Sequence, residues 1–143
     1  MPLSIRLKQA FFATFKSLYS MMPMLLAVIG LVGLFQVVVT PEMLQSVFNG
    51  SPVHDGLIGT LIGGISIGQP FFSYIIGGEL LDQGISLYAV CAFILAWVTL
   101  GVLQLPLEWS IFGGRFTLTR NLLSFIFALV IAWATVITLG VLS

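Results

Sequence analysis

Residues 55–84 read DGLIGTLIGGISIGQPFFSYIIGGELLDQG, and this stretch decides the fold. Its two apolar flanks meet at Gly68, Gln69 and Pro70. Proline cannot donate a backbone hydrogen bond and disfavours helix at the preceding residue, while glycine weakens a helix. We therefore expect a broken helix within residues 52–82. Its halves, 55–67 and 70–82, would each cover only about 20 Å, which is less than the thickness of a hydrocarbon core.

The chain around this segment is too apolar for a water-soluble fold. Its 143 residues are 59% hydrophobic and 7% charged, whereas soluble domains carry about 25% charged residues. Lipid must therefore be the solvent for much of the chain, and we expect an all-α, polytopic membrane protein. The formal net charge is zero, so the chain has no basic field that would attract nucleic acid.

Apolar runs of membrane length predict three full crossings, in one transmembrane domain that covers residues 1–143. A helix of about 20 residues spans the hydrocarbon core, and runs of that size occupy 21–39, 85–105 and 120–142. Pro23 falls in the first turn of the first crossing, where its missing N–H does least harm.

Short helices at the membrane interface are expected to precede and follow the first crossing. Residues 1–20 have apolar side chains at helical spacing and three basic residues, which is typical of an amphipathic helix that lies flat before the crossing. Alternatively, they extend the first crossing at its cytoplasmic end. Thr40, Pro41 and Glu42 form the pattern of a helix start, so residues 41–49 are predicted to be a second interfacial helix.

The positive-inside rule helps to decide whether residues 52–82 cross the membrane or re-enter. Suppose that the basic N-terminus is cytoplasmic. If the broken segment is a re-entrant hairpin, then Arg115 and Arg120 also face the cytoplasm, and all five basic residues lie on one side. If it crosses fully, both arginines fall outside. The rule favours the hairpin.

Broken helices at membrane depth occur where they are buried in protein or line a water-filled cavity, and their free ends bind ions or polar substrates. Glu79 is an acid within an apolar segment, which makes it a functional candidate. Alternatively, the glycines only allow close helix packing and the proline only kinks the helix. The candidate residues of a solute path are Ser66, Gly68, Gln69, Pro70, Ser73, Tyr74 and Glu79.

Residues 63–108 read GGISIGQPFFSYIIGGELLDQGISLYAVCAFILAWVTLGVLQLPLE and resemble the predicted-permease family that includes the arsenical permease ArsP. The shared pattern is a glycine-rich segment with a proline break, a short helix that ends in LLDQGISLYAV, and a long Ala/Phe helix. Family members are commonly twice this length and have two related halves. The resemblance therefore implies a half-size permease of the cell membrane that works with a second copy or with a related half-protein.

The arsenical members carry cysteines near the break, whereas the nearest thiol here is Cys91 on the next helix. Trivalent arsenic prefers thiolate ligands, so this chain departs from the family in the feature that would select arsenic.

The function we expect is therefore that of a permease-like subunit that moves a small solute or ion past the broken helix, in an oligomer or with a second half. The alternative is a membrane subunit that transports nothing and stabilises a partner. No HExxH or GxSxG motif, metal-ligand cluster or phosphate-binding glycine loop is present in the sequence, so we expect neither an enzyme nor a bound cofactor or metal.

Overall fold

The computed structural model describes residues 3–66 and 68–142. All regular elements in these ranges are helices, and the ranges contain no β-strand, so the all-α prediction is confirmed. Two helices are long and apolar enough to cross a membrane, one in each of the two units into which the chain divides, Met1–Val38 and Val39–Ser143.

The first unit is one continuous helix, α1 (Leu3–Val38). The structure has no helix boundary between the predicted lead-in at 1–20 and the predicted crossing at 21–39, which agrees with the alternative that the lead-in extends the same helix. Pro23 lies in the interior of α1 rather than in a first turn. An interior proline removes one backbone hydrogen bond but does not have to end the helix. In α1 the helix continues on both sides of Pro23.

The second unit begins with α2 (Pro41–Val47), and its start is the predicted one. The Thr40 hydroxyl accepts a hydrogen bond from the Met43 backbone N–H at 3.4 Å, with proline at the first helical position and Glu42 in the first turn. The helix ends at Val47, two residues before the predicted end at residue 49.

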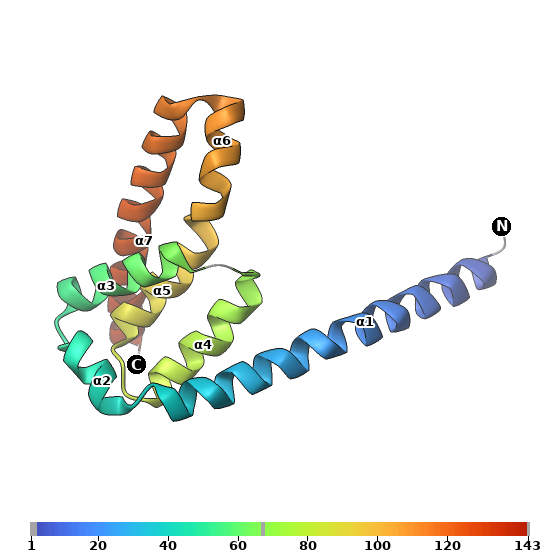
Figure 1. Ribbon diagram of the computed structural model, residues 1–143, viewed down its shortest axis with the longest axis horizontal. Coiled ribbons are helices and arrows are strands. Elements are labelled where there is room, and N and C mark those ends of the chain that lie inside the picture. The colour runs from blue at the N-terminus through green and yellow to red at the C-terminus, as the bar shows by residue number, and fades with distance from the viewer. Residues whose placement is uncertain (1–2, 67, 143) are drawn as a thin grey trace. The chain divides into compact units, whose positions relative to one another are not determined.

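The predicted break divides the next segment into α3 (Pro52–Ile65) and α4 (Pro70–Asp82). Both helices pack on α5 (Leu87–Thr99), which lies at the centre of this unit (Figure 1). The two glycines Gly59 and Gly63 allow α3 to approach α5 closely. A Cβ on Gly59 would lie 2.2 Å from the Ala89 carbonyl oxygen, and one on Gly63 would lie 2.2 Å from that of Phe93.

These contacts also give the direction of each helix. Residue numbers rise together along α3 and α5, so the two helices run parallel. On α4, a Cβ on Gly77 would meet Val90 and Ile94, whereas one on Gly68, just before the helix, would meet Trp97. The numbers fall along α4 as they rise along α5, so α4 is antiparallel to both. The chain therefore reverses between α3 and α4, as the hairpin interpretation requires.

The prediction of one helix over 85–105 is wrong. Helix α5 ends at Thr99, Leu100 and Gly101 have extended backbone, and a 3-10 helix η1 (Val102–Gln104) leads into α6 (Leu105–Phe112). The physical reason lies downstream of the break. In a continuous α-helix, Pro106 would clash with the Val102 carbonyl and leave it without a donor, and Gly101 lowers the helix propensity further.

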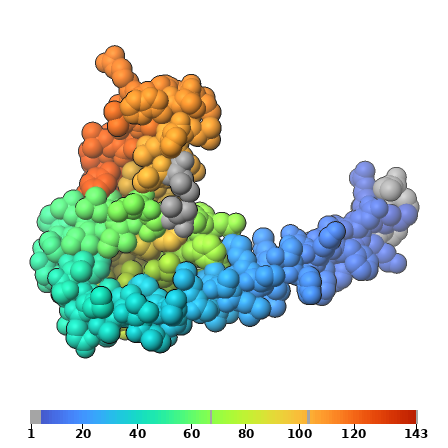
Figure 2. All heavy atoms as spheres, viewed as in Figure 1, coloured from blue at the N-terminus to red at the C-terminus, as the bar shows by residue number. Residues whose placement is uncertain are grey.

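Residues 107–119, which lie between the two predicted crossings, are mostly helical as well. Helix α7 (Gly114–Leu142) starts six residues before the predicted crossing at 120–142 and contains all of it. A tight turn at Gly113, which has a φ of 83°, makes α6 and α7 antiparallel neighbours (Figure 1). An ion pair between Glu108 and Arg120 joins the two helices. In the space-filling view, α6 and the adjoining part of α7 stand out from the body that contains α2–α5 (Figure 2).

Candidate functional site

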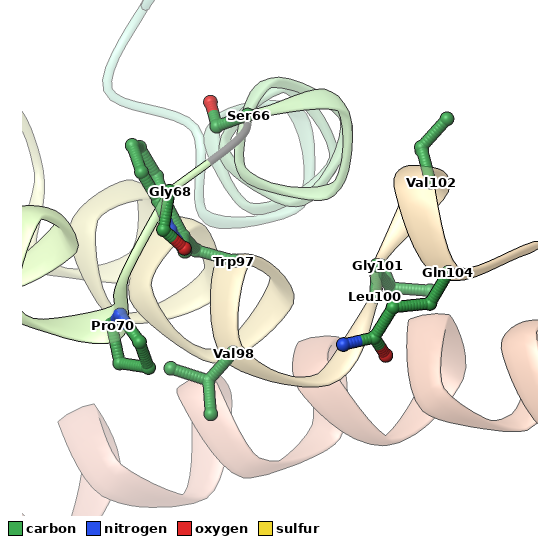
Figure 3. Close-up of a pocket in the computed structure, with 9 residues that line it drawn as sticks. All are labelled: Ser66, Gly68, Pro70, Trp97, Val98, Leu100, Gly101, Val102 and Gln104. Atoms are coloured by element: carbon green, nitrogen blue, oxygen red, sulfur yellow. The ribbon is translucent and has the colours of Figure 1, made fainter.

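The two helix breaks meet at one cavity. Its volume is about 190 Å³, and it lies between the α3–α4 turn and the segment that joins α5 to η1 (Figure 3). The described residues that line it are Ser66, Gly68, Pro70, Trp97, Val98, Leu100, Gly101, Val102 and Gln104. Non-helical backbone from two places that are about 30 residues apart in the sequence therefore faces the same space.

The first break is fixed by contacts at both of its ends. Helix α3 ends where the Ser66 backbone N–H donates to the Ile62 and Gly63 carbonyls, at 3.1 and 3.2 Å. Gly68 has a φ of 150°, a conformation that favours glycine. Its carbonyl accepts a hydrogen bond of 3.2 Å from the Trp97 indole N–H, which ties this turn to α5.

The second break places a polar side chain at the cavity. Gly101 has no Cβ, and the Gln104 side chain folds over it: a Cβ built there would lie 3.0 Å from the Gln104 Cδ and Oε1 atoms. The Gln104 backbone N–H donates to the Gly101 carbonyl at 2.8 Å, which closes η1. Any larger residue at position 101 would therefore displace the amide of Gln104.

Helix ends give the cavity its electrostatic character. The carbonyl ends of α3 and α5 both reach it, at Ser66 and Leu100. The amino end of α4 reaches it at Pro70, which has no N–H to offer, and the Phe72 N–H is bonded to the Gln69 carbonyl at 3.0 Å. The amino ends of η1 and α6 reach the cavity as well, at Val102 and Gln104, so helix ends of both partial charges face it. None of the nine residues that line the cavity in the described structure has a charged side chain.

The structure brings three of the seven predicted path residues to this cavity: Ser66, Gly68 and Pro70. Gln69 is exposed at the start of α4 and is not among the described lining residues, and Tyr74 is exposed on the same helix. Ser73 is fully buried, and its hydroxyl donates to the Pro70 carbonyl at 2.6 Å.

Glu79 lies near the other end of α4, about 14 Å along the helix from Pro70. There its Oε1 atom accepts a hydrogen bond of 3.0 Å from the Gln83 side-chain amide. The structure therefore separates Glu79 from the break that it was grouped with.

Sequence reasoning missed the half of the site that α5 and η1 contribute. Trp97, Gly101 and Gln104 lie within a run that was interpreted as one apolar crossing. The pattern that marks the second break is Gly101 followed five residues later by Pro106, with Gln104 as a polar residue between them.

Sequence reasoning also did not reveal the role of Asp55. Its carboxylate is fully buried and accepts three hydrogen bonds, from the backbone N–H groups of Asn49 (3.1 Å) and Gly50 (3.2 Å) and from the Ser86 hydroxyl (2.7 Å). The Ser86 oxygen in turn accepts from the Ala89 N–H at 3.4 Å and caps α5. Asp55 thus holds the starts of α3 and α5 at the same end of the unit.

A second cavity has a different character. It holds about 440 Å³ between α3 and α7 and is lined by Val53, Leu57, Leu129, Val130, Trp133, Ala134 and Ile137. The indole N–H of Trp133 donates to the Pro52 carbonyl at 3.3 Å. The side chains at this groove are apolar, so it offers little to a polar solute.

Within the described residues, no group of three or more His, Cys, Asp or Glu side chains is placed to hold a metal ion. Comparisons of the chain with protein-family models, with curated proteins and with solved structures gave no match.

Proposed function

We propose that this chain is a permease-like membrane subunit, and that a small solute or ion passes through the cavity between the two helix breaks. The observation that carries the proposal is the convergence of both breaks on that cavity. One break can be a packing irregularity. Two breaks that face one space with uncharged polar groups match the way in which transporters use discontinuous helices to bind polar cargo.

The membrane location is supported by the surface of α7. Large apolar side chains are exposed along the whole helix, from Phe116 to Leu142. Helix α7 has 29 residues and is about 43 Å long, enough to cross the hydrocarbon core and reach both headgroup regions. A buried core helix of a soluble protein would hide these side chains instead.

The depth of the cavity follows if α7 spans the bilayer. Leu100, at the second break, packs with Ala96 and with Ala128 of α7. Ala128 is the middle residue of α7, about 21 Å from either end. The cavity then lies near the bilayer midplane, where transporters place their substrate sites.

The α3–α4 turn also supports the proposed partnership with a second copy or with a related half. Gly68, Gln69 and Pro70 are exposed. Irregular backbone at this depth cannot face lipid, because hydrocarbon offers no hydrogen-bond partners. Either protein or a water-filled space must cover this turn. A second half, as in the permeases that the sequence resembles, would cover the turn with protein and enclose a water-filled space beside it.

The alternative is a subunit that transports nothing and only stabilises a partner. The close approach of α3 to α5 at Gly59 and Gly63 favours it, because small residues there serve tight packing. Water access to the cavity separates the two functions: a permease needs a hydrated path to the breaks, and a packing subunit keeps them dry.

The test is the accessibility of a single cysteine to a membrane-impermeant thiol reagent, added from either side of sealed, oriented membranes. Cys91→Ser removes the native thiol, and Ser66→Cys places the probe at the cavity. Two matched controls separate water access from simple exposure. Ser73→Cys lies in the first turn of α4 but is buried, and Phe127→Cys lies next to Ala128 at the depth of the cavity, on the exposed surface of α7.

We expect Ser66→Cys to react, with protection by the transported solute once it is known, and both controls to stay unreactive. If Ser66→Cys is as unreactive as the two controls, while a cysteine near the N-terminus is labelled normally, the cavity is dry. The packing function would then replace the permease.

A further inference from the structure

We propose that the basic segment of α1, residues 5–20, binds the headgroups of anionic lipids by lying along one surface of the membrane. This inference rests on the membrane location in the proposed function and does not need the transport path. Three features of α1 support it: its length, the two different sides of the basic segment, and the sign of its charges.

Helix α1 is longer than the hydrocarbon core of a bilayer. Its 36 residues rise about 54 Å, whereas the core is about 30 Å thick and takes about 20 residues. Residues 21–38 have no charged side chain and rise about 27 Å. Arg6, Lys8 and Lys16 all precede them, and charged side chains are costly in hydrocarbon. Residues 21–38 therefore fill the core, and the basic segment lies outside it.

One side of the basic segment is too apolar to stand in water. Leu7, Phe11 and Phe15 follow one another at intervals of four residues, so they share one side of the helix. They are 63%, 68% and 64% exposed. A helix that projected into water would leave this apolar side hydrated, which the hydrophobic effect opposes. A helix that lies in the interface buries it at the boundary between headgroups and acyl chains.

The other side of the basic segment is polar. Because each residue of a helix turns by about 100°, Gln9, Lys16 and Ser20 lie opposite the apolar side. Arg6 and Lys8 lie on the two flanks, from which long basic side chains reach the headgroup layer while their stems cover apolar surface. All three basic residues can therefore contact headgroups in one orientation of the helix.

The charges select anionic lipids. The basic segment has three basic residues and no acidic one, which gives a net charge of +3, and the first acidic residue of the chain is Glu42. Each Lys or Arg near an anionic leaflet strengthens binding by about 1 kcal/mol, which is about fivefold in affinity. A zwitterionic surface gives no such gain. A second copy of this segment would bring like charges together and repel it.

Pro23 gives α1 a place to bend toward the membrane surface. It lies three residues after the basic segment, and its missing N–H leaves the Tyr19 carbonyl without its helical donor. Kinks of membrane helices concentrate at such positions, and the helix continues through them. A kink at Pro23 adds to the ordinary tilt of a crossing, about 20° on average, and brings the basic segment closer to the plane of the headgroups.

The experiment measures which lipid surrounds the basic segment of the full chain in nanodiscs. In a Cys91→Ser background, Gln9→Cys carries a fluorophore on the polar side of the segment. Val38→Cys carries the same fluorophore at the other end of α1, where residues 39–54 contain no Lys or Arg. The bilayer is phosphatidylcholine with a small fraction of nitroxide-labelled phosphatidylglycerol or, in a parallel sample, of nitroxide-labelled phosphatidylcholine. Quenching then reports the labelled lipid next to each probe.

We expect phosphatidylglycerol to be enriched over phosphatidylcholine at the Gln9 probe, by about fivefold or more, and not at the Val38 probe. The triple variant Arg6→Gln, Lys8→Gln, Lys16→Gln should lose the enrichment, and molar salt should weaken it. Arg115→Gln, which removes an exposed charge from α7, should keep it. Equal quenching by the two lipids at the Gln9 probe, or an enrichment that survives in the triple variant, would overturn the proposal.

Two further outcomes separate this proposal from the proposed function. If neither lipid quenches the Gln9 probe while both quench the Val38 probe, water or protein surrounds the basic segment, and only the lipid site is wrong. If neither probe is quenched by either lipid, α1 is not in the bilayer, and the membrane location is wrong together with the lipid site. The labelling of Ser66→Cys is measured independently, so enrichment at Gln9 with an unreactive Ser66→Cys supports the lipid site and rejects the permease.

Discussion

Asp55 shows how one buried side chain can set the arrangement of three segments. Its carboxylate bonds to two backbone N–H groups of the 49–50 loop and to the hydroxyl that caps α5. The remaining described ionic contact is with His54, whose Nδ1 lies 3.5 Å from Oδ1. A carboxylate without a strong counter-charge is retained in a buried position only when hydrogen bonds replace its hydration.

Asp55→Asn tests this role. The amide keeps the shape of the carboxylate, but one of its two terminal groups can only donate, so it meets a donor where an acceptor is needed. We expect a loss of about 2–4 kcal/mol in the free energy of unfolding, since hydrogen bonds to charged groups are worth about 1.5–3 kcal/mol each. Asp82→Asn, at an exposed position, should stay within about 0.5 kcal/mol. Similar losses for both variants would contradict this role.

Gly59 makes a second prediction at the scale of one residue. A methyl group there would overlap the Ala89 carbonyl, which belongs to the backbone and cannot rotate away. Gly59→Ala should therefore force α3 and α5 apart and cost about 1–3 kcal/mol or more. Gly78→Ala is the matched control, because nothing lies within 4 Å of its added Cβ. Denaturation in detergent measures both, and equal stability of the two variants would refute the close helix approach.

At the scale of elements, the sequence predicted those features whose cause is local. Thr40, Pro41 and Glu42 place the start of α2, and Pro70 places the start of α4, because capping and proline chemistry act within one turn. The early end of α5 was missed because the apolar run continues past Thr99 to Leu103, so hydropathy alone does not show that the backbone becomes extended at Leu100 and Gly101. The meeting of the two breaks is a tertiary contact, which no local pattern records.

The contact between the breaks can be tested by Trp97→Phe. The Trp97 indole N–H donates the side-chain hydrogen bond that joins α5 to the Gly68 carbonyl. Phenylalanine keeps the aromatic packing on Phe93 but cannot donate this hydrogen bond. We expect faster hydrogen exchange at 68–72, by about two- to tenfold for a bond worth about 0.5–1.5 kcal/mol. Trp109→Phe, on α6, should leave exchange there unchanged; an equal effect would show that Trp97 does not hold the turn.

Helix α2 carries a pH dependence of its own. Hydrogen bonds from the backbone N–H of Glu42 itself and from the Thr40 hydroxyl lower the pKa of the Glu42 carboxyl from its ordinary value of 4.5. A lowered folded-state pKa adds stability above the unfolded value of about 4.5, which is lost as pH falls through the folded value. The protection factors of the Met43 and Leu44 amides, which correct for the intrinsic slowing of exchange as pH falls, should therefore decrease only below about pH 4.5, and Glu42→Gln should remove the change. A decrease already between pH 7 and 5 would require another titrating group.

At the scale of the second unit, the distribution of helices is uneven. Helices α3 and α5 pack on one half of α7, α4 packs on α5, and α6 accompanies the other half of α7 (Figure 1). The cavity lies where this change occurs, beside the middle of α7. Under the proposed function, we expect water or a second half to reach the breaks from the half of the unit with fewer helices, which also carries Arg115 and Arg120.

The hairpin of α3 and α4 predicts a membrane topology for the whole chain. If the chain spans the bilayer as proposed, we expect α5 with α6 to make the crossing that follows the hairpin, and Arg115 and Arg120 to lie on the side of the basic N-terminus. In a Cys91→Ser background, Gln9→Cys and Thr119→Cys should react with an impermeant reagent from the same side, and Leu142→Cys from the other. If Thr119→Cys reacts from the side opposite to Gln9→Cys, residues 52–82 form a full crossing. The break would then lie within a spanning helix rather than at the tip of a re-entrant hairpin, and the two breaks would belong to two successive crossings.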